Sequence, residues 1–372
     1  MPFASFDHDP RTRLVFGPGS LARLGVLARE LGAQRVLVVT DAGIRKAGHV
    51  ERATRLLASE GLDFRVFDGV EENPTTHHVE AGAALARGHK ADFLVGLGGG
   101  SSMDCAKGIN FVLTQGGELH EYRGVGKATL PMLPLIAVPT TAGTGSESQS
   151  FALISDPVTH LKMACGDRKA AARIAILDPE LTLTQPTVVA GSTGIDAVSH
   201  AVETLVTRKR TPLSRMFSLE AWRLLEANLE SVLKDPNDVD ARSGMLLGAS
   251  LAGAAIENSM LGATHSAANP VTARFGVVHG QAVGILLPHV VRFNAPECEP
   301  EYRALASTSE LLARRLEALY AATGLPRTLR DFGVEASDLS KLARVAATQW
   351  TAQFNPRTVT ESDFLEIYQC AL

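Results

Sequence analysis

The sequence predicts an α/β domain of the nucleotide-binding kind, followed by an all-helical domain. Three observations support this fold class. Short apolar runs alternate with helical periodicities in the first half, glycine-rich loops follow two of those runs, and long helical periodicities replace the strands in the second half. A chain of 372 residues also exceeds the usual size of one hydrophobic core, so two domains are expected.

In the first half, four apolar runs predict buried strands, at residues 35–40, 64–67, 93–97 and 135–138. Helical patterns lie between them, for example at 50–59 and 79–87. Strands and helices that alternate in this way predict parallel βαβ units.

From Pro186 onward the sequence contains almost no convincing strand. Long helices are predicted instead, for example at 213–233 and 241–255. Pro186 and the glycines between 191 and 194 interrupt the chain at the change of pattern. We therefore expect an α/β domain over 1–185 and a helical domain over 186–372.

Composition excludes several classes of protein. A net charge of −4 disfavours a nucleic-acid partner, which would need a basic surface. The sequence has no apolar run of roughly 18 residues, the length needed to span a membrane, and its start lacks a signal-peptide pattern. The four cysteines are scattered without a Cys-x-x-Cys pair, which favours reduced thiols in a cytoplasmic protein.

Two loops after predicted strands favour a nucleotide ligand. The first is Gly98-Gly99-Gly100-Ser101, where glycines allow close approach to a phosphate at a helix N-terminus. The second, Pro139–Glu147, follows the next strand and contains small hydroxyl residues suited to ribose and phosphate contacts. A tight turn and a capped helix start are the structural alternatives for the two loops.

Asp41 ends the first predicted strand. A carboxylate at this position can accept hydrogen bonds from the adenosine ribose hydroxyls and would repel a 2′-phosphate, which predicts NAD over NADP. A helix N-cap is the equally common structural interpretation of such an aspartate.

A second set of residues predicts a metal site. Asp196 and His200 are four residues apart, so on a helix they share one face and can bind one ion. His265 and His279 lie between small residues, which leave room for an ion and a substrate. One carboxylate with three imidazoles and no thiolate favours Fe(II) or Zn(II) and disfavours a structural zinc site rich in cysteine. Such an ion can polarise an alcohol or carbonyl oxygen.

Together these motifs closely resemble the iron-containing (group III) alcohol dehydrogenase family over nearly the whole chain. The resemblance rests on Phe16–Ser20, Gly98–Lys107, Pro139–Glu147, Gly194–His200, His265–His279, Leu286–His289 and Asn355–Arg357. It implies an N-terminal dinucleotide domain, a C-terminal helical metal-binding domain and an NAD-linked oxidoreductase, in a family whose members are commonly dimers or larger.

The resemblance implies roles for individual residues wherever this sequence matches a motif of the family. The metal ligands, and with them the catalytic centre, would be Asp196, His200, His265 and His279. The NAD site would be lined by Asp41, Gly98, Gly99, Ser101, Asp104, Thr140, Thr141 and Lys162. Glycerol dehydrogenases, dehydroquinate synthases and the metal-free maleylacetate reductases are relatives with a different ligand set or none. The retained histidines place this chain nearer the alcohol dehydrogenases.

The chain departs from the family pattern at two positions. Asn269 stands where many members have a second histidine, and an amide cannot titrate, so a proton relay through this position is in doubt. Ile256 stands where a phenylalanine is frequent. With Phe151 and Thr351, it would form a mixed apolar substrate pocket that has more room than one closed by phenylalanine.

Three functions are consistent with the sequence. The leading hypothesis is an NAD-dependent alcohol dehydrogenase acting on small primary alcohols, diols or the matching aldehydes. A hydroxyacid–oxoacid transhydrogenase with tightly held NAD is the second, and it would need a cation such as Arg274 for the substrate carboxylate. A non-catalytic metal- and nucleotide-binding protein is the third, which the intact ligand sets disfavour.

Overall fold

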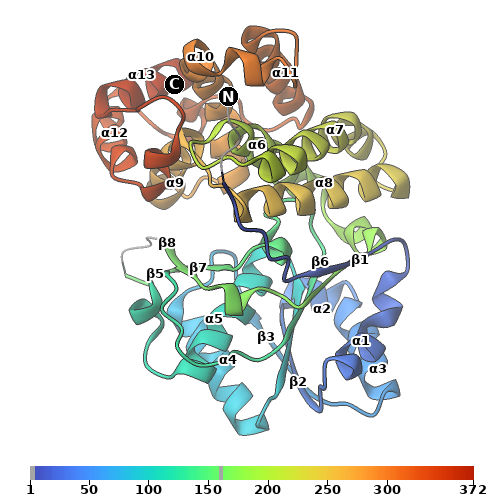
Figure 1. Ribbon diagram of the computed structural model, residues 1–372. Helices are drawn as coiled ribbons and strands as arrows, with labels where there is room; N and C mark the ends of the chain where they lie inside the picture. Colours follow the sequence, from blue (N-terminus) through green and yellow to red (C-terminus); the bar gives the residue numbers. More distant parts are fainter. Residues whose placement is uncertain (1–4, 159–161) are drawn as a thin grey trace. The chain divides into compact units, whose positions relative to one another are not determined.

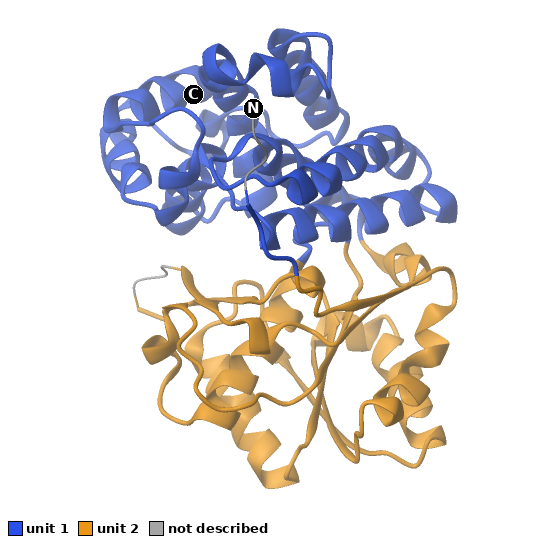
Figure 2. Ribbon diagram, viewed as in Figure 1, with its two compact units in different colours: residues 1–8, 142–145, 186–372 blue, residues 9–141, 146–185 orange. Residues whose placement is uncertain are grey.

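The computed structural model describes residues 5–158 and 162–372, and the contacts between residues divide them into two compact units (Figure 2). Residues 9–141 and 146–185 form one unit, which we call the α/β unit. Residues 5–8, 142–145 and 186–372 form the other, the helical unit. The long segment of the helical unit begins at Pro186, and a short N-terminal segment and four loop residues are grouped with it.

The α/β unit is built on a six-stranded sheet with the order β1-β9-β6-β4-β2-β3 (Figure 1). Every pairing in it is parallel. The strands are β1 Arg13–Phe16, β2 Arg35–Asp41, β3 Asp63–Val70, β4 Phe93–Gly98, β6 Leu135–Pro139 and β9 Ile174–Leu177. The four predicted strands are β2, β3, β4 and β6. The sequence analysis missed β1, most of whose residues are exposed, and β9, an apolar run as clear as that at 135–138.

Helices cover both faces of this sheet, as parallel strands require. They are α1 Leu24–Glu30, α2 Ala42–Lys46, α3 His49–Ser59, α4 Thr76–His89 and α5 Gly100–Gln115. Successive residues of β2 point to opposite faces. Val36 and Val38 belong to one buried cluster with Leu27 of α1, and Leu37 belongs to a second cluster with Ile109 of α5. The sheet is therefore doubly wound.

A second, smaller sheet completes this unit. It contains β5 Gly124–Val125, β8 Lys162–Gly166 and β7 Phe151–Ser155, in that order. β7 and β8 are antiparallel, with Phe151 opposite Gly166. A Cβ at Gly166 would come within 2.3 Å of the Phe151 ring, so the glycine is needed for this close approach.

The helical unit contains α6 Thr187–Val206, α7 Pro212–Lys234, α8 Val239–Glu257, α9 Ala263–Phe275, α10 His279–Tyr302, α11 Ser309–Ala322, α12 Leu339–Ala347 and α13 Glu361–Ala371. Nearly every residue of α6 from Ala190 onward is buried, and α6 packs against α7, α8 and α10. Its alanines, serines and glycines allow these close approaches. After Leu177, the described part of the chain forms no strand, as predicted.

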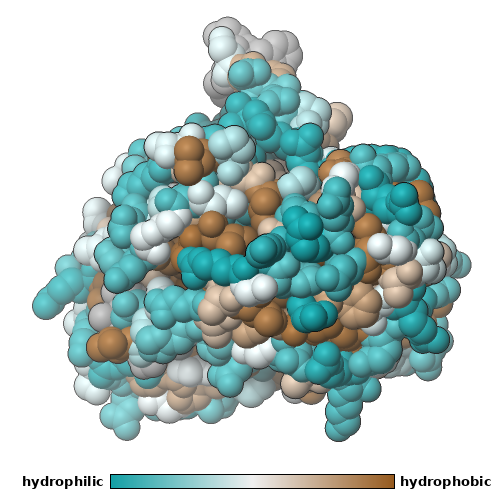
Figure 3. Space-filling view, turned by 90° about the horizontal axis from the view of Figure 1, so that it is seen from below, coloured by the Kyte–Doolittle hydropathy of each residue, from teal (hydrophilic) through white to brown (hydrophobic). Residues whose placement is uncertain are grey.

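The surface is of the ordinary mixed kind. In the face shown in Figure 3, apolar residues form scattered areas between polar ones. Among the helices of the described ranges, none combines the length and the apolar character needed to cross a membrane.

Candidate metal centre and nucleotide site

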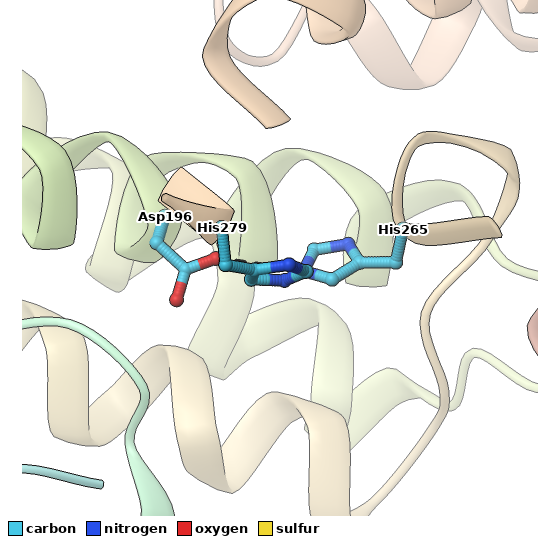
Figure 4. Close-up of side chains that lie close together, drawn as sticks. All are labelled: Asp196, His265 and His279. Carbon is cyan, nitrogen blue, oxygen red and sulfur yellow. Dashed lines mark ion pairs between the residues drawn. The ribbon is translucent and has the colours of Figure 1, made fainter. Parts of the chain in front are cut away.

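The four predicted metal ligands come together inside the helical unit, from three helices. α6 carries Asp196 and His200, one turn apart, and Figure 4 shows Asp196 with the two histidines that come from other helices. His265 lies in the first turn of α9, and His279 is the first residue of α10. Segments separated by up to 83 positions, from residue 196 to residue 279, thus meet at one point.

Asp196 Oδ1 is the centre of this cluster. The Nε2 atoms of His200, His265 and His279 lie 3.4, 3.6 and 3.8 Å from it, respectively. His200 Nε2 and His265 Nε2 are 3.1 Å apart. One ligand atom from each of Asp196, His265 and His279 lies within 4.8 Å of the others. This convergence of one oxygen and three ring nitrogens matches a divalent metal site.

The hydrogen bonding of the cluster also fits an ion. Asp196 Oδ1 is buried and accepts no hydrogen bond of ordinary geometry within the described residues. A buried carboxylate oxygen without a donor is unfavourable unless a cation compensates it. The donor set therefore fits a bound divalent cation better than it fits a purely structural network.

The electrostatics of the cluster are strongly coupled. Burial opposes charge on His265, but the Glu203 and Asp196 carboxylates outweigh it and raise the pKa of His265 to about 9. Burial lowers the pKa of His200 to about 4, against the influence of Asp196. Despite its burial, the pKa of Asp196 is held well below its usual range by His200 and the other two imidazoles. The site therefore concentrates negative charge that a cation would neutralise.

Small residues allow the helices to come this close. Gly280 follows His279, and a Cβ on it would lie 2.0 Å from the Ser192 carbonyl oxygen of α6. Only glycine permits α10 to begin against α6 in this way. The contact places His279 within reach of Asp196, which is one turn further along α6.

Sequence reasoning missed Glu203, which is buried on α6 beside the cluster. Its Oε2 lies 2.5 Å from His265 Nδ1, and its Oε1 accepts a hydrogen bond from the Thr264 N–H at 2.7 Å. The spacing could have revealed it, because Glu203 follows Asp196 by seven residues and His200 by three, and so lies on the same helix face.

The first predicted nucleotide loop lies at the carboxyl end of β4 in the α/β unit. The second follows β6, and its residues 142–145 are grouped with the helical unit. α5 begins at Gly100, with Gly99 as an N-cap that makes no side-chain hydrogen bond. The first N–H groups of α5 are therefore available to an anion. Gly98 has φ +147°, and a Cβ on it would come within 2.5 Å of Ser102 Oγ. A Cβ on Gly99 would touch Thr141.

Asp41 lies at the end of β2 and is the N-cap of α2, accepting a hydrogen bond from the Ile44 N–H at 3.0 Å. Its other carboxylate oxygen accepts a bond from Ser102 Oγ at 3.3 Å. The structural interpretation of Asp41 is thus confirmed, and its role toward a ribose remains a prediction. Ser101 is half-buried in the first turn of α5. Thr140 is buried, and its hydroxyl finds no partner among the described residues.

Asp104 and Lys107 form a buried polar cluster with Ser146. Lys107 Nζ donates to the carbonyl oxygens of Ser146 at 2.6 Å and Phe151 at 2.9 Å, and to Ser146 Oγ at 2.8 Å. Ser146 Oγ donates to Asp104 Oδ1 at 2.6 Å. Burial raises the pKa of Asp104, while Lys107 and the exposed Lys162 lower it. Lys107, to which the sequence analysis gave no role, thus joins α5 to the end of the second loop and to the start of β7.

The predicted pocket residues are distributed over both units. Phe151 begins β7 of the α/β unit, whereas Ile256, Asn269 and Thr351 belong to the helical unit. Asn269 Nδ2 donates to Gln349 Oε1 at 3.2 Å. Thr351, on the short helix η8 Trp350–Phe354, shares a hydrogen bond of 2.7 Å with Ser266.

Arg274, the cation considered for a substrate carboxylate, forms an ion pair with Asp338 at 2.6 Å. Its guanidinium also lies over the Phe275 ring. Since its charge is already paired within the helical unit, Arg274 is poorly suited to anchor a carboxylate substrate.

A doubly wound α/β unit with phosphate-type loops and a helical unit with an Asp–His₃ cluster define a class of metal-dependent, nucleotide-linked oxidoreductases. Comparison with known proteins identifies the family. Residues 10–179 match the model of the iron-containing alcohol dehydrogenases, and residues 190–372 match the C-terminal model of the same family. The chain belongs to the iron-containing alcohol dehydrogenase family and is an oxidoreductase of the alcohol dehydrogenase type.

Relatives match along the full length. The chain is 33% identical to an NAD-dependent methanol dehydrogenase of Bacillus methanolicus, over 96% of this chain and 97% of the relative. It is also 33% identical to a 1,3-propanediol dehydrogenase of Citrobacter freundii, over the whole of both chains. A crystal structure of a 1,3-propanediol oxidoreductase superposes with a TM-score of 0.95 at 32% identity, covering 99% of this chain and 100% of the other.

Proposed function

We propose that this protein is a metal-dependent, NAD(H)-linked alcohol dehydrogenase and aldehyde reductase that acts on small primary alcohols, diols or aldehydes. The observation on which the proposal rests is the convergence of three imidazole nitrogens on one buried carboxylate oxygen, with Nε2 to Oδ1 distances of 3.4–3.8 Å. Family membership and the NAD-dependent methanol dehydrogenase among the relatives support the same conclusion.

In this proposal, Asp196, His200, His265 and His279 bind the ion, which is Fe(II), with Zn(II) as the alternative. When bound, such an ion polarises an alcohol or carbonyl oxygen. The chain's own contribution is to hold the four ligands rigidly. Asp196, His200 and His265 are buried in the helical unit, and α6 fixes two of the four ligands at one-turn spacing.

The NAD site is proposed at the carboxyl-terminal edge of the parallel sheet. When bound, the nicotinamide cofactor would supply the hydride acceptor (NAD+) for alcohol oxidation and the hydride donor (NADH) for aldehyde reduction. The open N–H groups at the start of α5 would bind the pyrophosphate, next to Gly98 and Gly99. Asp41 would accept hydrogen bonds from the ribose, and Ser101, Asp104, Thr140, Thr141 and Lys162 would line the rest of the site.

For the substrate, we propose a pocket in which Ile256 leaves more room than a phenylalanine would. Ile256 is buried in the helical unit, near the end of α8. Replacing it by phenylalanine (Ile256→Phe) should shift the preference toward shorter alcohols, because a larger side chain fills more of the pocket. The measurement is kcat/KM over a series of primary alcohols. An unchanged chain-length preference would show that Ile256 does not line the pocket.

The proposed function is tested by anaerobic reloading. Metal-free protein is loaded separately with Fe(II) and Zn(II), and NADH absorbance is followed with a panel of alcohols, diols and aldehydes. Turnover that requires both the metal and added NAD supports the proposal. Activity that is independent of added NAD, with NAD retained through gel filtration, would instead indicate the transhydrogenase. If NADH absorbance did not change with any substrate in either metal state, although metal and NAD were bound, the proposed substrate class would be contradicted.

We also propose a cytoplasmic homodimer or larger homo-oligomer. All four cysteines are free, which is consistent with a reducing compartment. The edge strand β1 exposes Leu14 and Phe16 beside an unpaired backbone edge of the sheet, a pattern that favours pairing with another chain. Light scattering of the purified protein measures the mass directly, and a monomer at working concentration would contradict the proposed assembly.

A further inference from the structure

We propose that Glu203 is the positioning residue of the metal centre: it fixes the ring of His265 and thereby sets the affinity of the site for its divalent ion. The inference rests on the proposed metal site and adds to it a residue outside the ligand set. Glu203 is 4% exposed, and the described structure gives both of its carboxylate oxygens a donor.

The contact with His265 determines which ring nitrogen is free. Nδ1–H donates to Glu203 Oε2 at 2.5 Å, so the proton of the neutral ring is held at Nδ1. Nε2 then presents its lone pair to the cluster, 3.6 Å from Asp196 Oδ1 and 3.1 Å from His200 Nε2. A carboxylate that holds the far nitrogen of a ligating histidine fixes both its tautomer and its orientation.

The geometry of α6 makes this contact rigid. Asp196, His200 and Glu203 follow at intervals of four and three residues, so all three lie on one face of a single buried helix. The helix that supplies two ligands therefore also orients a third, which comes from α9. A shift of α9 relative to α6 would break the bond to Glu203 at the same time as it displaced His265.

Glu203 has a second contact, which provides a control. α9 begins after Gly262, which has no side chain to cap the helix. Two distant side chains replace the cap: Glu203 Oε1 accepts from the Thr264 N–H at 2.7 Å, and Asn355 Oδ1 accepts from the Ala263 N–H at 3.2 Å. A Cβ on Gly262 would come within 2.9 Å of Asn355 Oδ1 and 3.2 Å of Glu203 Oε1, so the glycine makes room for both acceptors.

The two acceptors differ in one respect. Asn355 caps the same turn of α9, and its other described hydrogen bonds join it to Asn294 and the Arg357 carbonyl, so it touches none of the four ligands. Glu203 caps the turn and also holds a ligand. Asn355→Ala therefore removes the cap and the bonds to Asn294 and Arg357, and leaves every contact of the four ligands in place. Glu203→Gln removes the charge and leaves one oxygen acceptor for two donors.

The experiment measures the affinity of full-length, metal-free protein for Zn(II) by competition with a chromogenic chelator. NAD binding and the thermal midpoint serve as checks of folding. We expect Glu203→Gln to weaken Zn(II) binding by about 10- to 100-fold, the usual effect of losing such a partner. Asn355→Ala should lower the thermal midpoint while leaving Zn(II) affinity within about threefold of wild type, since capping contributes about 1 kcal/mol to the fold alone.

Equal Zn(II) affinity in Glu203→Gln and wild type, or an equal loss in Asn355→Ala, would overturn the inference while leaving the metal site in place. A wild-type protein that binds no Zn(II) would overturn both. If Glu203→Gln does not fold, nitrogen NMR of the Zn(II)-loaded wild type decides. The His265 signal, assigned by its absence in His265→Gln, should carry its proton on Nδ1, and a proton on Nε2 would refute the positioning role.

Discussion

The metal cluster and the nucleotide loops are built in opposite ways. The cluster consists of side chains that three helices bring together from positions 196 to 279, and three of the four, Asp196, His200 and His265, are buried. The predicted nucleotide loops are short, continuous stretches of sequence, and the first of them offers main-chain N–H groups at the start of α5. The first site depends on the identity and orientation of side chains, whereas the second depends on backbone conformation.

This difference determines how each site should respond to substitution. A ligand or the packing around it can be changed in the helical unit without altering the backbone of the α/β unit. A glycine of the phosphate loop can be changed without moving a metal ligand. The following variants test whether the two sites are separable in this way.

Removing a ligand should have the largest effect. We expect Asp196→Ala to lower turnover by about three orders of magnitude, because polarisation of the substrate oxygen by a metal is worth several kcal/mol. Steady-state NADH formation measures the loss, and equilibrium binding should show NAD affinity unchanged. If NAD binding disappeared together with activity, the two sites would not be separable.

The second-largest effect should come from a change in packing next to the metal cluster. In Gly280→Ala, the new Cβ would lie 2.0 Å from the Ser192 carbonyl oxygen, so α10 must shift and carry His279 away from Asp196. We expect Zn(II) affinity to fall by about tenfold or more, in line with the 1–3 kcal/mol typical of overpacking. Gly88→Ala, in α4, is the matched control, since Gly88 is also a helical glycine without a positive φ and a Cβ there would meet no atom within 4 Å. Equal metal affinity in both variants would refute the packing argument.

The corresponding change in the nucleotide loop is Gly98→Ala. Gly98 has φ +147°, and a Cβ there would collide with Ser102 Oγ, which bonds to Asp41. We expect NAD affinity to fall by about tenfold, since strain of this kind is worth 1–3 kcal/mol, while Zn(II) affinity stays unchanged. Gly116→Ala, at the other end of α5 with φ +77° and no atom within 4 Å, is the control. A loss of metal affinity in Gly98→Ala would contradict the comparison.

The smallest effect should come from Asp41→Ser. Serine is also a good N-cap, so α2 should keep its start while the negative charge is removed. We expect the preference for NAD over NADP, measured as a ratio of kcat/KM values, to fall by several-fold to about tenfold, because the repulsion of a 2′-phosphate is lost. An unchanged ratio would show that Asp41 does not discriminate NAD from NADP and acts only as the N-cap of α2.

Much of the architecture could be predicted from local patterns. β2, β4 and β6 are buried apolar runs long enough to be recognised, and α7 and α8 show a clear helical period. β1 was missed because it is a short edge strand with mostly exposed residues, which leaves no apolar run to recognise, whereas β9 is an apolar run that could have been recognised. Asp196 and His200 were recognisable because the ligands share one helix.

The sequence by itself determined the class of fold, the family and the chemical types in each site, since these depend on periodicity and on motifs within short stretches. Only the tertiary structure showed that Glu203 holds His265, that Asn355 caps the helix of His265 from 92 residues away, and that Gly280 allows α10 to meet α6. These are contacts between residues distant in sequence. They arise from the packing of whole helices, which no local pattern specifies.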